Sequence, residues 1–129
     1  MSDIENARQL LTLAAEDVEA MEVLKDAEHV STRIFGFHAQ QAVEKALKAW
    51  LSIAGVTYPL THSLTVLFGL LEDRVGAEIR EYSDLETLTP FAVQFRYGAY
   101  VEDEAEMDRG QIIDRVKQLI DYVRSLAAC

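Results

Sequence analysis

Apolar residues recur at spacings of three and four along most of this chain, which is the pattern of helices that bury one face. The first run extends from about Asp3 to Lys25, and Ser2 or Asp3 can cap its start. A second run follows the potential N-cap Ser31 and reaches Ala54, where Gly55 supplies a stop signal. Because its apolar positions cover more than half of the helix circumference, this second helix is predicted to contact neighbours on several sides.

Three further helices are predicted after a short connection at 56–60. Thr61 or Ser63 can cap the third helix, which fades near residue 73, and a turn or short helix at about 75–82 follows it. The fourth helix is placed at about 85–97, with Pro90 at a kink or in a first turn. The last helix is expected to begin near Glu102 or Asp103 and to end at about residue 126. The sequence therefore predicts an all-α protein: an antiparallel up-and-down bundle of about five helices in one domain, 1–129.

Composition supports one well-packed domain. Half of the 129 residues are hydrophobic, and only two are proline and six are glycine. Twelve basic against twenty-two acidic residues give a formal net charge of −10, which disfavours non-specific binding of nucleic acid. A local basic patch can still bind phosphate, because physiological salt largely screens the field of the protein's other charges beyond about 8 Å.

The only cysteine, Cys129, excludes an intramolecular disulfide and a cysteine-based metal cage. Neither an export signal nor a run of about 18 uninterrupted apolar residues is present. These features lead us to expect a cytoplasmic protein.

A polar stripe on the second helix is the first candidate site. His38, Gln41, Lys45 and Lys48 are spaced by three, four and three residues, so they share one helix face. One interpretation is a solvated face with Glu44 and Lys48 as an ordinary i,i+4 pair. The other is a nucleotide-contact surface on which Lys45 and Lys48 supply positive charge to phosphate.

Arg96 and Tyr97 form the second candidate site, since a guanidinium can bind phosphate and a phenol ring can stack on a base. Tyr100 could extend this surface. The structural alternative is that Arg96 binds carbonyls at the end of the fourth helix or pairs with an acidic neighbour.

The remaining polar residues predict no metal site and no cofactor. The three histidines show no zinc-binding spacing; His29 is expected to be solvated in a turn, and His62 to bond backbone or close the loop before the third helix. The acidic run at 102–108 lacks calcium-loop spacing and is predicted to form the acidic first turn of the last helix.

The second-helix string Phe37-His38-Ala39-Gln40-Gln41-Ala42-Val43-Glu44-Lys45-Ala46-Leu47-Lys48-Ala49 resembles the helix that marks the HEPN family (higher eukaryotes and prokaryotes nucleotide-binding). Three further pieces follow in the family's order: Thr61–Leu64, Leu88–Ala92 and Arg96–Tyr97. The resemblance implies a bundle of about five helices, frequent homodimerisation and a polar site near the end of the fourth helix. Relatives include RNA-cleaving toxins, partners of minimal nucleotidyltransferases and binding modules, so the family does not imply one activity.

The resemblance also implies how a catalytic member would be recognised. Ribonucleases of the family carry an arginine followed, after four to six residues, by a histidine that moves a proton while the arginine stabilises phosphate charge. Counted from Arg96, these positions hold Val101, Glu102 and Asp103, and no tyrosine stands two residues further on, where some nucleotidyltransferase partners modify one. An Arg-His ribonuclease is therefore disfavoured.

We accordingly expect a non-catalytic, nucleotide-associated subunit that acts as a homodimer with a minimal nucleotidyltransferase, in a toxin-antitoxin-like or regulatory pair. Its ligand would be a nucleotide or RNA. Two alternatives stay open. One is a divergent ribonuclease toxin that uses Arg96 with Glu102 or His62 as the base. The other is a pure protein-interaction module that assembles through an apolar surface of the second or last helix.

Overall fold

Six helical elements make up the described part of the chain. The computed structural model describes residues 3–27, 29–92 and 107–128. The elements are α1 (Asp3–Leu24), α2 (Thr32–Ile53), α3 (Leu64–Val75), α4 (Ala77–Arg80), the 3-10 helix η1 (Ser83–Ala92) and α5 (Arg109–Ala127). No strand occurs within these ranges, and the predicted all-α helical bundle is confirmed.

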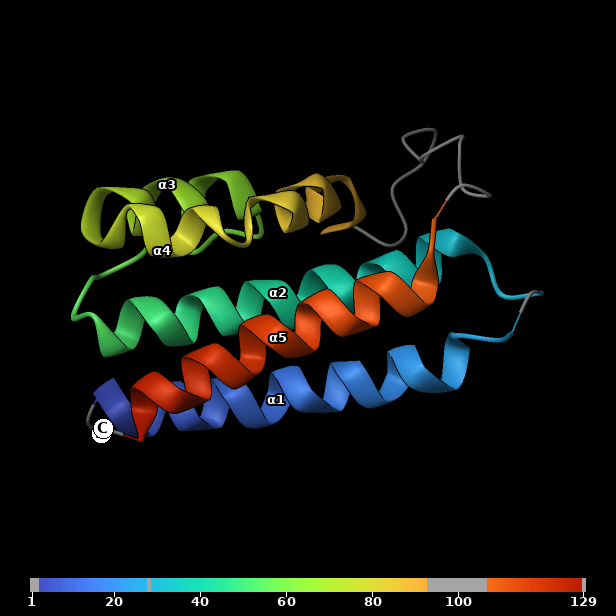
Figure 1. Cartoon of the computed structure of the whole chain (residues 1–129), viewed down its shortest axis with the longest axis horizontal. Helices are drawn as coiled ribbons and strands as arrows, with labels where there is room; N and C mark the ends of the chain where they lie inside the picture. Colours follow the sequence, from blue (N-terminus) through green and yellow to red (C-terminus); the bar gives the residue numbers. More distant parts are fainter. Residues whose placement is uncertain (1–2, 28, 93–106, 129) are drawn as a thin grey trace.

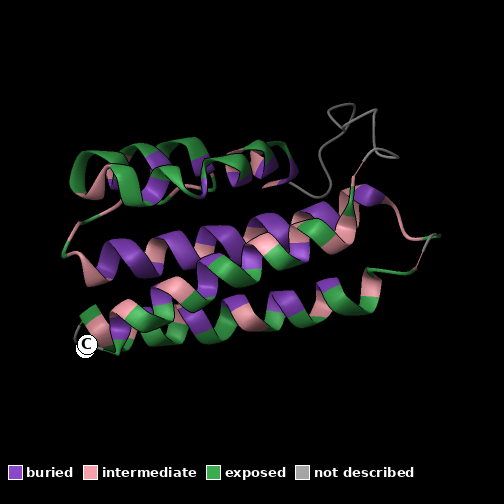
Figure 2. Ribbon diagram, viewed as in Figure 1, coloured by how far each residue is buried: buried purple, intermediate pink, exposed green. Residues whose placement is uncertain are grey.

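Helix α2 lies at the centre of the arrangement (Figure 1). It packs along α1 on one side, and α3 and η1 contact it on the other. Helix α5 contacts both α1 and α2, and α1 runs antiparallel to both of them (Figure 1). None of the residues of α2 is classed as exposed, in agreement with the prediction that this helix has neighbours on several sides (Figure 2).

Local capping signals set the ends of the central helices. The Ser31 hydroxyl accepts a hydrogen bond from the Ile34 amide at 3.4 Å, and the Ser63 hydroxyl accepts one from the Val66 amide at 3.3 Å. Each bond satisfies one of the free N–H groups of a helix start. Gly55, which follows the C-cap residue Ala54 of α2, has a φ of 74°, a conformation that glycine adopts at little cost. The predicted boundaries of α2 and the cap of α3 are confirmed.

The predicted fourth helix needs correction. Its described part is a 3-10 helix that begins at Ser83, and residues 93–97 lie outside the described residues. Pro90 cannot donate the amide hydrogen bond that an α-helix requires. The hydroxyls of Thr87 and Thr89 donate to the carbonyls of Asp84 and Glu86, both at 2.9 Å. These local bonds compete with regular α-helical hydrogen bonding.

The last helix also begins later than predicted, at Arg109 rather than near residue 102. Asp108 is its N-cap, and the side chain accepts a hydrogen bond from the Gln111 amide at 3.0 Å. Met107, expected inside the helix, instead precedes it and packs against the core from a partly buried position. Glu102–Glu106 lie outside the described residues, so their predicted role as an acidic first turn stays a prediction.

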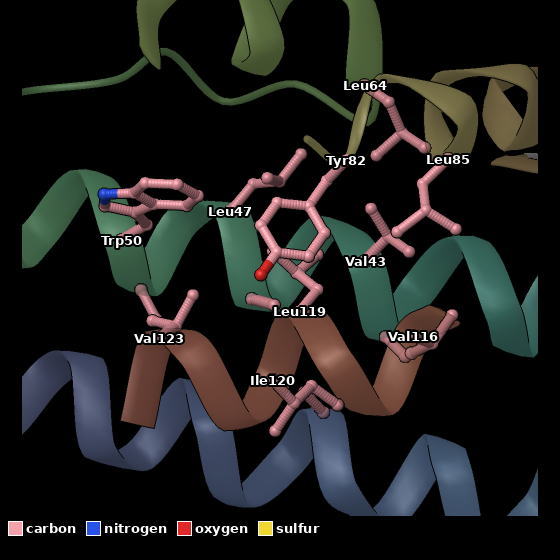
Figure 3. Packing of buried hydrophobic residues seen from close by; sticks show 14 of the residues in the cluster. Val43, Leu47, Trp50, Leu64, Tyr82, Leu85, Val116, Leu119, Ile120 and Val123 are labelled. Atoms are coloured by element: carbon pink, nitrogen blue, oxygen red, sulfur yellow. The ribbon is translucent and has the colours of Figure 1, made fainter. Parts of the chain in front are cut away.

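The hydrophobic core lies where α2 meets α5, α3 and η1. Figure 3 shows Val43 and Leu47 of α2 packed with Leu119 of α5 on one side. Leu64 of α3 and Leu85 of η1 pack against them from the other side. All are at most 3% exposed. None of the helices within the described ranges combines the length and the apolar character that crossing a membrane requires.

Candidate functional site

The predicted polar stripe occupies one strip of α2 between two neighbouring segments. His38, Gln41, Lys45 and Lys48 are all partly exposed positions on a helix that is otherwise mostly buried. The side chains of His38, Lys45 and Lys48 are 29%, 24% and 14% exposed. His38 and Lys45 contact α1, whereas Lys48 lies 5.8 Å from the centre of the Tyr58 ring in the connection to α3. Solvent can therefore reach the stripe, although α1 lies along one side of it and the connection to α3 along the other.

A carboxylate from α1 holds one end of the stripe. Asp17 Oδ1 lies 3.2 Å from His38 Nδ1, and Asp17 Oδ2 accepts a hydrogen bond from Lys45 Nζ at 2.6 Å. The Asp17 side chain is 12% exposed, and it occupies a position among the buried residues of α1. We call Asp17, His38 and Lys45 the Asp17 cluster. Because a buried carboxylate requires compensation, this pairing fixes the side chains of His38 and Lys45 in place.

A second carboxylate holds the other end of the stripe. Glu44 Oε2 accepts a hydrogen bond from Lys48 Nζ at 2.9 Å, and Glu44 Oε1 lies 3.1 Å from His62 Nδ1. Gln40 Nε2 donates to Glu44 Oε1 at 3.0 Å and to the His62 carbonyl at 2.9 Å. We call Gln40, Glu44, Lys48 and His62 the Glu44 cluster. It joins α2 to the segment that enters α3.

The charge of Glu44 is stabilised in this cluster. Burial alone would raise the pKa of Glu44, whose side chain is 6% exposed. Hydrogen bonds from Gln40, Lys48 and His62 outweigh that effect and hold the pKa below its ordinary value. Glu44 is therefore ionised at neutral pH.

The two clusters have the same composition at their centres and lie next to each other. Each contains one carboxylate, one lysine and one histidine whose Nδ1 faces the carboxylate. Gln41 Nε2 donates to Gln40 Oε1 at 2.8 Å and thereby links the stripe to the Glu44 cluster. Each lysine retains N–H groups beyond the one given to its carboxylate. The arrangement can offer fixed donors to an anion while the bare positive charge is largely offset.

Two sequence interpretations are refined by this geometry. The Glu44–Lys48 i,i+4 pair exists, but it is largely buried rather than part of a solvated face. His62 does close the loop before α3, because its carbonyl accepts from Gln40, and its side chain also reaches Glu44. Asp17 was missed as a site residue. The available signal was an acidic side chain three residues after Ala14 and directly before Val18, which places Asp17 at the edge of the apolar face of α1.

The second candidate site lies outside the described residues. Arg96 and Tyr97 belong to the range 93–106, as do Tyr100 and the three positions where a ribonuclease histidine was sought. Their role stays a prediction. Within the part of the chain that the structure describes, no group of three or more histidine, cysteine, aspartate or glutamate side chains could hold a metal ion.

Comparison with known proteins assigns the chain to a family. The model of the HEPN domain matches residues 7–126, which is nearly the whole chain. Comparisons with curated proteins and with solved structures returned no match. The fold agrees with the family assignment, since the described residues form a strand-free bundle of helices. The chain belongs to the HEPN domain family.

Proposed function

We propose that this protein is a non-catalytic HEPN subunit that binds a nucleotide through the α2 stripe, with Arg96 and Tyr97 as further predicted contacts. It would act as a homodimer with a minimal nucleotidyltransferase, in a toxin-antitoxin-like or regulatory pair. The family assignment supports the class of protein. One observation supports nucleotide binding: His38, Lys45 and Lys48 lie together on one partly exposed strip, and a buried carboxylate fixes each of them.

The geometry of the stripe suits phosphate better than a diffuse polyanion. Lys45 Nζ is held by Asp17 at 2.6 Å and keeps two further N–H donors for phosphate oxygens. His38 uses Nδ1 toward the same carboxylate, which leaves Nε2 as the ring atom that can face a ligand. Because the donors are already ordered, binding requires little further loss of side-chain entropy. The neighbouring carboxylates limit non-specific attraction.

The absence of catalysis is inferred from the family motif. None of the positions five to seven residues after Arg96 is histidine. Both described histidines near the stripe direct Nδ1 toward a carboxylate that also holds a lysine. We therefore assign them a binding and structural role. RNA degradation by the purified protein that is lost in Arg96→Ala would contradict this and favour the divergent ribonuclease.

Calorimetric titration with ATP, GTP and a short single-stranded RNA tests the proposal. Saturable binding should weaken by about tenfold or more in Lys45→Ala and in Arg96→Ala, as expected when a charge-assisted hydrogen bond is lost. Lys117→Ala is the matched control, because Lys117 also pairs with a carboxylate, Glu22 at 2.9 Å, but on α5. Equal weakening in Lys45→Ala and Lys117→Ala would contradict a specific site.

A pure interaction module is the second candidate, and one observation favours it. Every lysine and histidine of the stripe already has a carboxylate within 3.2 Å. A purely structural role, in which the two clusters join α2 to its neighbours, therefore also explains these contacts. Leu60, fully exposed in the connection before α3, would then belong to a protein contact. Stable dimerisation without binding of any of the three ligands would favour this function.

A further inference from the structure

A second polar surface lies where α4 and the turn after it meet α5. Helix α4, the turn after it and α5 enclose an open depression of about 540 Å³. Its lining residues combine acidic and aromatic side chains: Ala77, Glu78, Arg80, Glu81, Tyr82 and Tyr122. None of these residues belongs to the stripe or to its two carboxylate clusters.

Aromatic rings form the inner side of this depression. Tyr82 and Tyr122 lie 6.0 Å apart between ring centres, and Trp50 lies 5.2 Å from Tyr122 and 6.4 Å from Tyr82. Figure 3 shows Trp50 and Tyr82 in the core between α2 and the opposite layer. Trp50 is 2% exposed and packs against the two tyrosines from the side of the core. The faces of such rings carry negative potential and attract cations.

The guanidinium of Arg115 already packs against the Tyr82 ring of this aromatic group. The Arg115 guanidinium lies 5.5 Å from the centre of the Tyr82 ring, donates to the Glu81 carbonyl at 2.6 Å and pairs with Asp84 at 2.9 Å. Ring face, carbonyl and carboxylate therefore accommodate a guanidinium in this part of the fold. Arg115 forms its ion pair with Asp84, and its charge also acts on Glu81 at the rim.

Two glutamates stand at the rim of the depression. The Tyr122 hydroxyl donates to Glu78 and positions that carboxylate. No described residue forms a hydrogen bond or ion pair with the Glu81 carboxylate. Arg80, which also lines the depression, pairs with Glu72 at 3.4 Å. Residues 72–86 contain six acidic and two basic side chains in a chain of net charge −10, so this surface attracts positive charge.

We propose that this depression is a docking site for a basic segment of a partner protein, with an arginine side chain placed against Tyr122 between Glu78 and Glu81. Guanidinium is favoured because it can stack on a ring and bind carboxylate in a forked geometry at the same time. The acidic surroundings would speed the encounter with such a segment. The site does not depend on nucleotide binding at α2.

A peptide in which arginine alternates with glycine tests this site. The chain has a single tryptophan, and Trp50 touches both tyrosines of the site, so its fluorescence should change as the peptide saturates the protein. Glu78→Gln and Glu81→Gln should each weaken binding by about tenfold, the loss expected for one charge-assisted contact. A peptide with glutamine in place of arginine should not bind.

Glu16→Gln is the control, because Glu16 is an exposed residue of α1 and its replacement removes the same charge elsewhere. It should leave the affinity unchanged. Equal weakening in Glu16→Gln and Glu81→Gln would show attraction to net charge alone and overturn the proposal. Absence of saturable binding, or binding without a change in Trp50 fluorescence, would overturn it too.

Discussion

Glu44 is held ionised in a nearly buried position, and its replacement should reveal how much the Glu44 cluster contributes to stability. The folded-state pKa lies below the reference value of 4.5, so the contribution is present above pH 4.5 and is lost as pH falls through the folded pKa. Glu44→Gln should lower the free energy of unfolding at neutral pH by about 1–3 kcal/mol. The difference from wild type should shrink below pH 4.5 in urea unfolding. Glu16→Gln is the exposed control, and a pH-independent difference for Glu44→Gln would contradict this account.

Gly36 lies in contact with η1 at a point where no side chain fits. A Cβ at Gly36 would lie 2.5 Å from the Phe91 ring, so the ring would have to move. Gly36→Ala should destabilise the protein by about 1–3 kcal/mol in chemical denaturation. Gly69→Ala in α3 is the control, because nothing lies within 4 Å of the added Cβ and the helix should gain about 0.5–1 kcal/mol. Similar effects at both positions would disprove the close packing.

The sequence identifies which residues share a face but not what they contact. The spacing of His38, Lys45 and Lys48 correctly placed them together on α2. Their partners could not be found in the same way, since Asp17 is 21 residues from His38 and lies on another helix. Side-chain periodicity describes one helix at a time, whereas ion pairs between helices depend on how the helices pack.

Among the helices, α5 is tied to the loop between α1 and α2 by its first residue. Arg109 donates to the carbonyls of Leu24, Ala27 and Val30 at 2.8, 3.3 and 2.7 Å. Its guanidinium also lies 5.3 Å from the centre of the Phe35 ring. One side chain therefore satisfies carbonyls at the end of α1 and in the following loop.

Arg109→Lys should loosen that junction, because an ammonium cannot span three carbonyls and stack on a ring. The expected loss is about 2 kcal/mol of unfolding free energy, measured by thermal denaturation. Arg124→Lys, an exposed arginine of the same helix whose contact with Asp121 is 3.6 Å, should change stability by less than about 0.5 kcal/mol. Equal melting temperatures for the two variants would contradict the role of Arg109.

Helix boundaries could be predicted where a strong local signal stands alone. Ser31 and Gly55 mark the two ends of α2, whereas either Thr61 or Ser63 could cap α3, and the structure shows that Ser63 is the cap. The start of α5 was misplaced because acidic residues at 102–108 offer several caps of similar quality, and only the structure shows that Asp108 is used. The 3-10 form of η1 was missed because apolar spacing at three and four residues fits both helix types.

At the scale of the whole molecule, fold class and family follow from pattern and motif order, whereas assembly does not. The proposed homodimer should sediment at twice the mass of the chain. Each copy carries a net charge of −10, so repulsion opposes association and added salt should strengthen the dimer. Sedimentation equilibrium in a salt series measures both effects. A monomer at every salt and protein concentration would contradict the homodimer.

Phosphate binding at the α2 stripe is the central claim, and Asp17→Asn tests it most directly by calorimetric titration with ATP. The amide oxygen of the replacement can still accept a hydrogen bond from Lys45 and keep that side chain ordered, but the charge that offset Lys45 is gone. Binding should therefore strengthen by about five- to tenfold, provided circular dichroism shows an intact fold. Weaker or unchanged binding in a folded Asp17→Asn protein, or no ATP binding by the wild type, would contradict the claim.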